Sequence, residues 1–152
     1  MIASSNNRQK QKTIKSVFNF SGIGLHSGKQ SNVIVKPGKI NEGINFFRTD
    51  ILENQQIKAI WNNVTSTILS TTISNEHGVS ISTIEHLMSA LSGMHVDNIN
   101  IFINGPEVPI MDGSSQPFVE LLEKAQIIDQ DENRKIIKVK KDVKVTNKDS
   151  FV

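Results

Sequence analysis

The sequence feature that most constrains the fold is residues 81–94, ISTIEHLMSALSGM, which have the periodicity of one amphipathic helix. Apolar side chains recur at i, i+3, i+4 and i+7, namely at Ile84, Leu87, Met88 and Leu91. This spacing predicts a single buried stripe. Ser82 occupies an N-cap position, and Gly93 stands where a helix can end. We therefore expect a helix that begins after Ser82 and ends at Gly93.

The opposite face of this helix carries only small neighbours around one histidine. At about 100° per residue, His86 lies nearly opposite the apolar stripe. Its neighbours on that face are Ser89, Ala90 and Gly93. A solvated helix face ordinarily carries Lys and Glu, and this one has neither. Another layer of protein or a ligand is therefore expected to approach the helix closely.

Composition excludes several classes of protein. The 152 residues allow one ordinary domain, or one domain and the start of another. The absence of Cys rules out disulfides, thiolate metal sites and cysteine nucleophiles. The net charge of +2 is spread along the chain, so we expect no nucleic-acid partner. No apolar run approaches the roughly 20 residues of a membrane span, and we expect a cytoplasmic protein.

Alternating patterns predict most of the remaining elements. We expect strands within residues 13–20, 32–36, 43–48, 67–74 and 98–104, with 32–36 and 43–48 forming a hairpin. A second helix is expected from Pro117 onward, with a buried stripe of Phe118, Leu121, Leu122 and Ala125. Strands that are mostly hairpin-connected and two helices on one face predict an α+β fold, a two-layer sandwich with a mostly antiparallel sheet.

The chain divides into four predicted parts. Residues 1–11 are a flexible lead-in, residues 12–128 the first α+β domain, and residues 129–135 a charged linker. Residues 136–152 are expected to be the truncated start of a second α+β domain, since alternation resumes from residue 135 to 145 as a strand pair. Two strands alone are marginally stable.

Glu85 and His86 are the main candidates for chemistry. In a structural interpretation, Ser82 and Glu85 form a capping box at the helix start. In a functional one, the helix N-terminus keeps the His86 imidazole neutral, as a metal ligand requires, and Glu85 acts on a nearby water. A catalytic zinc needs about three protein ligands, and this helix supplies one.

The other candidates are mostly given structural interpretations. Three glycines in residues 21–29 predict a tight turn where the backbone passes close to another group. His26 lies in that turn, and for it the surface and ligand-facing interpretations both stay open. His77 and His95 are interpreted as surface residues. Glu107 and Asp112 are interpreted as turn and cap residues.

Five motifs together resemble a known family. The sequence from about Lys12 onward is similar to the bacterial zinc-dependent UDP-3-O-acyl-N-acetylglucosamine deacetylases, which catalyse the committed step of lipid A biosynthesis. The motifs that carry the resemblance are GIGLHSG (22–28), FRTD (47–50), ISTIEH (81–86), DNI (97–99) and PIMDGS (109–114).

The resemblance implies roles for five residues. The family's general base matches Glu85, and a zinc ligand matches His86. The family's residue matching His26 lies near the metal, and the residues matching Leu69 and Ser70 approach the substrate. In the family, two similar α+β domains face each other across the active site, and the other zinc ligands and a catalytic His lie in the second domain.

These expectations give a leading hypothesis and two rivals. The first is an N-terminal fragment of a zinc-dependent hydrolase that removes the N-acetyl group of UDP-3-O-acyl-N-acetylglucosamine. It would be inactive alone and could assemble in trans with a separate C-terminal half. The second is a non-catalytic remnant or binding module of the same fold, in which Glu85 only caps the helix. The third is a complete metalloenzyme, with a metal site completed by His26, His77 or His95.

Overall fold

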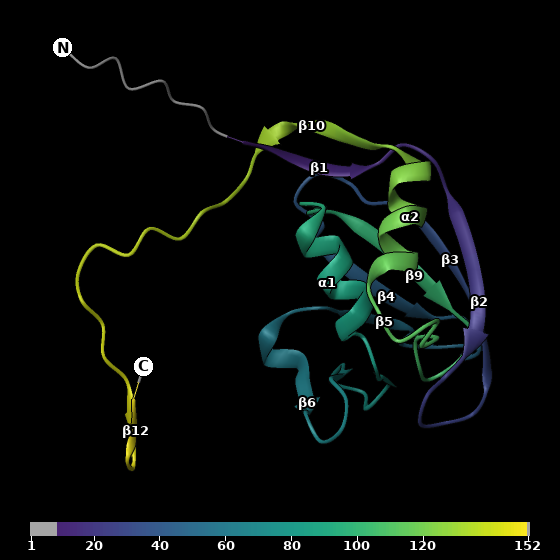
Figure 1. Cartoon of the computed structure of the whole chain (residues 1–152), viewed down its shortest axis with the longest axis horizontal. Helices are drawn as coiled ribbons and strands as arrows, with labels where there is room; N and C mark the ends of the chain where they lie inside the picture. Colours follow the sequence, from purple (N-terminus) through teal and green to yellow (C-terminus); the bar gives the residue numbers. More distant parts are fainter. Residues whose placement is uncertain (1–8, 152) are drawn as a thin grey trace.

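The computed structural model describes residues 9–151 of the chain, and its main body has two layers. One layer is a five-stranded sheet in the order β2-β3-β9-β4-β5. The other is formed by helices α1 (Glu85–Gly93) and α2 (Gln116–Ala125), which pack side by side over one face of that sheet (Figure 1). The predicted α+β sandwich with both helices on one face is confirmed.

The main sheet differs from the prediction in one connection. Its strands are β2 (Phe18–Ile23), β3 (Gln30–Pro37), β4 (Ile44–Arg48), β5 (Gln56–Lys58) and β9 (Ile99–Ile103). Neighbours are antiparallel except β4 and β9, which are parallel. The predicted hairpin of residues 32–36 and 43–48 is wrong because β9 lies between β3 and β4. This central position buries the inward-facing isoleucines of β9 to 1% exposure or less, namely Ile99, Ile101 and Ile103.

The helices close the core largely as their periodicity predicts, although Met88 and Leu121 of the two stripes are only half-buried. Ile84, Leu87 and Leu91 are buried, and Phe118 of α2 makes an edge contact with Phe20 of β2, with ring centroids 5.4 Å apart. Ala90 lies on the face where another layer of protein or a ligand was expected, and it is 2% exposed. Since α2 packs against α1, the far face of α1 is partly covered by protein.

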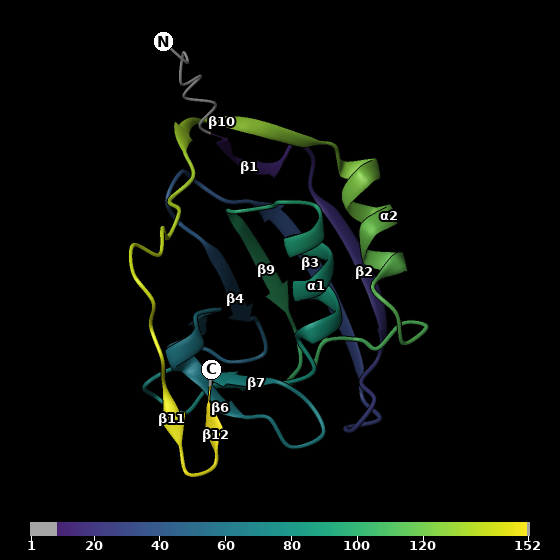
Figure 2. The same ribbon diagram turned by 60° about the vertical axis from the view of Figure 1, so that its left-hand side comes forward.

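A smaller sheet lies at one end of the main sheet (Figure 2). It contains β6 (Val64–Ser66), β7 (Thr72–Ser74) and β8 (Ser80–Ile81), preceded by the 3₁₀ helix η1 (Trp61–Asn63). The strand expected over residues 67–74 is therefore only partly formed. Leu69 has a φ of 63°, which no strand can accommodate, and residues 67–71 form a loop.

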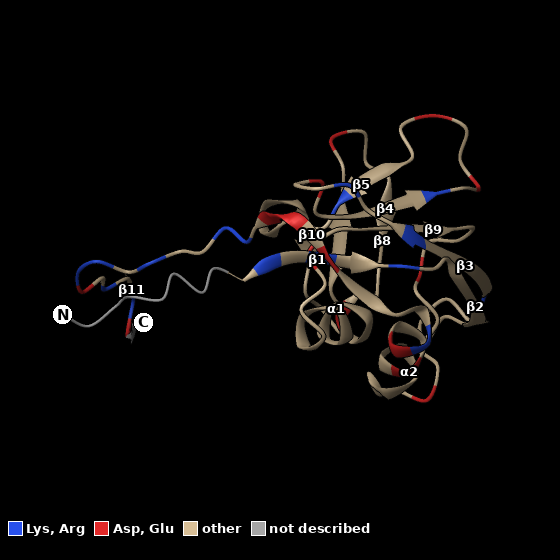
Figure 3. Cartoon of the chain, turned by 90° about the horizontal axis from the view of Figure 1, so that it is seen from above, with Lys and Arg blue, Asp and Glu red and all other residues tan. Residues whose placement is uncertain are grey.

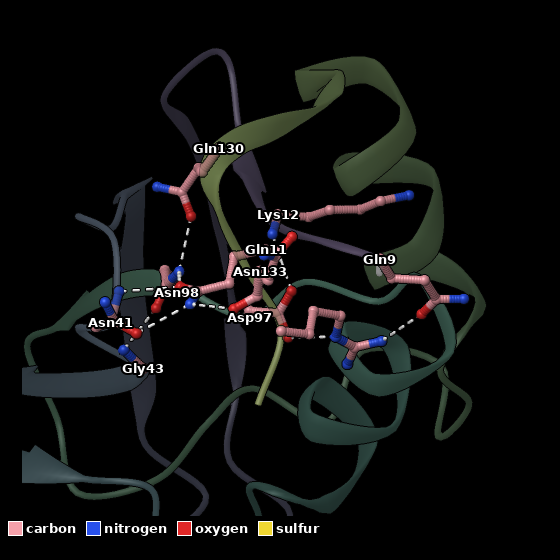
Figure 4. Close-up of polar contacts among 10 residues, drawn as sticks. Gln9, Gln11, Lys12, Asn41, Gly43, Asp97, Asn98, Gln130 and Asn133 are labelled. Carbon is pink, nitrogen blue, oxygen red and sulfur yellow. Dashed lines mark hydrogen bonds and ion pairs between the residues drawn. The ribbon is translucent and has the colours of Figure 1, made fainter. Parts of the chain in front are cut away.

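The opposite end of the body is closed by β1 (Lys10–Ile14) and β10 (Ile127–Asn133), an antiparallel pair. Figure 4 shows the polar contacts that fix this pair to the start of β9. The buried amide of Asn98 donates to Oε1 of Gln11 at 2.8 Å and to Oε1 of Gln130 at 2.7 Å. Asp97 and Arg134 form an ion pair at 2.8 Å.

The chain after β10 differs from the predicted strand pair. Residues 129–133, expected as linker, belong to β10, and residues 135–145 form no strand. The apolar side chains of that stretch are 64% exposed or more, so no partner surface completes a sheet there. A short hairpin, β11 (Thr146–Asn147) and β12 (Ser150–Phe151), follows and lies apart from the body (Figure 1). The division into domains remains a prediction.

Charge is less evenly distributed than expected. Figure 3 shows basic residues along the segment that follows β10, where the lysines are Lys135, Lys138, Lys140, Lys141, Lys144 and Lys148. Within residues 9–151, no helix is long and apolar enough to cross a membrane.

Candidate active site

The candidate site lies at the N-terminal end of α1. The Gly-rich turn between β2 and β3, the residues just before α1 and the segment after β9 converge there. Ser82 and Glu107 form a parallel β-bridge, with the Ser82 N–H donating to the Pro106 carbonyl at 2.9 Å. The Ile110 N–H donates to the Ile23 carbonyl at 3.1 Å, which ties in the end of β2.

Glu85 opens α1, but it does not form the predicted capping box. The helix begins at Glu85, two residues later than a Ser82 cap requires, and no side chain caps it. Thr83 has a φ of 57°, so the helical path cannot extend back through it. Oε2 of Glu85 instead accepts the Thr71 N–H at 3.0 Å. Glu85 is thereby anchored to the loop of residues 67–71.

His86 follows Glu85 and is half-buried. The pKa of the nearby Asp112 is lowered below its ordinary value, and an electrostatic interaction with His86 is the smallest of the causes. The larger causes are hydrogen bonds from the backbone N–H and the hydroxyl of Ser114 to the Asp112 carboxylate. The turn-forming role predicted for Asp112 is confirmed.

Glu107 is the residue that the sequence prediction underestimated. Its side chain is 1% exposed, and its carboxylate accepts bonds from the His26 N–H at 2.9 Å, the Ser27 N–H at 2.7 Å and the Thr83 hydroxyl at 2.8 Å. Burial raises the pKa of Glu107. The hydrogen bonds from Ser27, His26 and Thr83 outweigh burial and lower it to about 2. Glu107 is therefore an ionised, buried anchor.

Gly24 explains why the turn is rich in glycine. A Cβ atom at this position would lie 2.4 Å from Oε2 of Glu107 and 2.4 Å from Oγ of Ser27. The predicted close approach of backbone to another group is thus confirmed, and the group is the Glu107 carboxylate. The glycine and the carboxylate are each visible in the sequence, but nothing in the sequence pairs two residues so far apart.

The other predicted residues lie in different surroundings. The His26 side chain is exposed, and its loop is held through the backbone bond to Glu107. Leu69 is 85% exposed, and Ser70 is half-buried beside Thr71, so both lie next to the anchor of Glu85. His77 and His95 are exposed, as predicted.

The described residues do not supply a complete metal site. Among residues 9–151, no group of three or more His, Cys, Asp or Glu side chains is placed to hold one metal ion. His86 carries the donor type that zinc prefers, but it would be one ligand of several.

Comparison with known proteins identifies the family. The family model of UDP-3-O-acyl N-acetylglycosamine deacetylase matches residues 11–152. This chain belongs to that deacetylase family. Its matched relatives include the UDP-3-O-acyl-N-acetylglucosamine deacetylases of Shewanella pealeana, 43% identical over 141 residues, and Hahella chejuensis, 44% identical over 140 residues. The Syntrophus aciditrophicus deacetylase is 46% identical over 141 residues.

The match is nearly complete for this chain but partial for its relatives. The alignments cover 93%, 92% and 93% of this deacetylase-family chain, and 46%, 46% and 44% of the respective relatives. The chain thus spans about half the length of the curated relatives it matches, and corresponds to their N-terminal part. The resemblance inferred from the five motifs is confirmed.

Proposed function

We propose that this chain provides the Glu85–His86 part of a zinc-dependent deacetylase that acts on UDP-3-O-acyl-N-acetylglucosamine. The observation that carries the proposal is the position of these two residues. They stand side by side in the first turn of α1, both half-buried, and the Glu85 carboxylate is anchored by the Thr71 N–H. The names of the relatives support the reaction.

In this proposal Glu85 is the general base. Hydrolysis breaks the C–N bond of the acetamide and yields acetate and a free amine, and the attacking water must lose a proton. A positioned base contributes about 10²–10⁴-fold to such a step. A carboxylate has four acceptor lone pairs, so the bond from Thr71 orients Glu85 and leaves capacity to take that proton.

His86 would hold the zinc ion. A zinc ion bound there supplies a Lewis acid, which makes water reactive near neutral pH. Since residues 9–151 contain no three-donor cluster, the remaining ligands would come from outside these residues. We therefore propose that the 152-residue chain is inactive alone and works with a C-terminal region supplied in trans. The cytoplasm remains its predicted location.

Leu69 and Ser70 are the proposed substrate contacts within this chain. Leu69 is 85% exposed and lies in the loop whose Thr71 N–H donates to the Glu85 carboxylate. A molecule lying over this loop would therefore reach the start of α1. The left-handed φ of 63° at Leu69 is costly for a leucine, and such strain is common at binding sites.

The test is acetate release from UDP-3-O-acyl-N-acetylglucosamine, together with bound zinc, on the purified chain. Both are measured with and without the C-terminal region of the Shewanella pealeana relative. Turnover only when that region is added supports the proposal. Turnover and about one tightly bound zinc in the chain alone would contradict it and return attention to His26, His77 and His95. No turnover in either case would favour the non-catalytic module.

A further inference from the structure

Glu107 is a buried charge that the proposed chemistry does not use. Its side chain is 1% exposed, and its hydrogen-bond donors come from two segments remote in sequence, the turn of residues 24–29 and the residue two before Glu85. A buried carboxylate is costly unless its oxygens are fully bonded. Its presence here therefore calls for a role.

A single atom of Glu107 joins two parts of the candidate site. Oε1 accepts both the N–H of His26 at 2.9 Å and the hydroxyl of Thr83 at 2.8 Å. His26 begins no helix or strand, and the chain around it has no side chain of its own in the core. The relation between the His26 loop and α1 thus depends on this carboxylate.

Thr83 is the second residue whose arrangement depends on Glu107. It is β-branched, buried to 2% exposure and held at a φ of 57°, a conformation that such residues rarely adopt. Its hydroxyl bond to Glu107 is one of the contacts that hold it in that conformation. The same contact, together with the backbone bonds that join Ser82 to Pro106 and Val108, holds the segment from which α1 leaves, and with it the position of Glu85.

We propose that Glu107 is a positioning residue, which holds the His26 loop and the start of α1 in one fixed arrangement. It touches neither substrate nor metal and acts through His26 and Glu85. The catalytic purpose of this positioning rests on the proposed deacetylase function. The arrangement of the His26 loop and the start of α1 can be measured without any activity. Three donors on two oxygens require a carboxylate, because an amide in its place offers only one acceptor oxygen.

The first test is amide hydrogen exchange, monitored by NMR on the full 152-residue chain. In Glu107→Gln, exchange at His26 and Ser27 should accelerate about 10- to 100-fold, as expected for losing bonds to a charged acceptor. Exchange at Ile101, in the middle of β9, should change far less. Glu123→Gln, an exposed change on α2, is the matched control. Unchanged exchange at His26 and Ser27, or equal acceleration at Ile101, would overturn the proposal.

Thr83 gives an independent pair of variants, which decides the matter even if Glu107→Gln does not fold. Thr83→Val keeps the branched shape and loses the hydroxyl, whereas Thr83→Ser keeps the hydroxyl. The His26 amide resonance should move in Thr83→Val and return toward its wild-type position in Thr83→Ser. Identical His26 resonances in all three proteins would refute the positioning role.

Activity in the presence of the C-terminal region separates the two proposals. Glu107→Gln should lower kcat by about 10- to 100-fold, the scale of a misplaced catalytic group. A variant as active as wild type would refute the positioning role and leave the deacetylase function intact. If wild type itself is inactive, the deacetylase function fails, while the exchange results still decide what Glu107 holds.

Discussion

The hydroxyl of Thr83 donates a 2.8 Å hydrogen bond to Oε1 of Glu107, and both side chains are almost completely buried. The two residues are 24 positions apart and lie in different connecting segments, Thr83 between β8 and α1 and Glu107 between β9 and α2. Their contact fixes where α1 can begin, because the left-handed backbone at Thr83 lies just before it. Glu85 is consequently the first residue of the helix, and its carboxylate turns to Thr71.

Replacing Glu85 by Gln should remove activity and leave the fold intact. The amide oxygen can still accept the Thr71 N–H, so the free energy of unfolding should change by less than about 0.5 kcal/mol. Turnover with the C-terminal region present should fall at least about 100-fold, since an amide cannot accept the proton. Urea unfolding measures the change in stability, and acetate release measures the change in turnover. A loss of stability of about 1 kcal/mol with turnover retained would instead indicate a purely structural residue.

Replacing Gly24 by Ala should destabilise the fold. The new methyl group would meet Oε2 of Glu107 and Oγ of Ser27 at 2.4 Å, and relieving such crowding typically costs about 1–3 kcal/mol. Gly93→Ala is the matched control because nothing lies within 4 Å of its Cβ position and the residue is helical. It should be neutral or slightly stabilising. Equal unfolding midpoints in urea for both variants would contradict the crowding.

Glu107 should make stability depend on pH in the acid range. Its pKa is about 2 in the folded protein, below its ordinary value of 4.5. A depressed folded pKa means that the stabilisation is fully present above about pH 4.5 and is lost as pH falls through about 2. The difference in unfolding free energy between wild type and Glu107→Gln should therefore shrink between these values. Urea titrations at several pH values measure it, and a pH-independent difference would contradict the assignment.

Replacing Asn98 by Ala should loosen the β1–β10 end. The change removes the amide that donates to Oε1 of Gln11 and Oε1 of Gln130, and the oxygen that accepts the Gly43 N–H at 2.8 Å. Losing these partly buried bonds should cost about 1–3 kcal/mol. Asn19→Ala, an exposed change on β2, should alter stability by less than about 0.5 kcal/mol. Thermal or urea unfolding compares the two, and equal losses would argue against the network.

Local periodicity predicted what depends on local sequence. The buried stripes of α1 and α2 and the alternation of β9 each lie within a short window, so the layers and the helix-covered face followed from it. The position of β9 between β3 and β4 did not, because strand order is set by contacts between distant segments. The start of α1 was misplaced for the same reason: the contact of Thr83 with Glu107 overrides a local capping signal.

The candidate site was predicted unevenly. Glu85 and His86 stood out because adjacent acid and imidazole groups at a helix start are a local pattern. Glu107 was assigned to a turn, since a lone glutamate before a Val-Pro sequence gives no sign of burial. Its donors His26 and Ser27 are 81 and 80 positions away, and Thr83 is 24 positions away. Only the folded chain brings them together.

The order of strands in the sheet has a consequence for synthesis on the ribosome. The pairs β2-β3 and β4-β5 are each local hairpins, but they meet only through β9, which follows β4 by about fifty residues. Until residues 99–103 have left the exit tunnel, the two hairpins have no strand to join them and their inner edges stay unpaired. The long-range closure by β9 should therefore set the pace of folding, and a chain stalled before residue 99 would expose two open edges to aggregation.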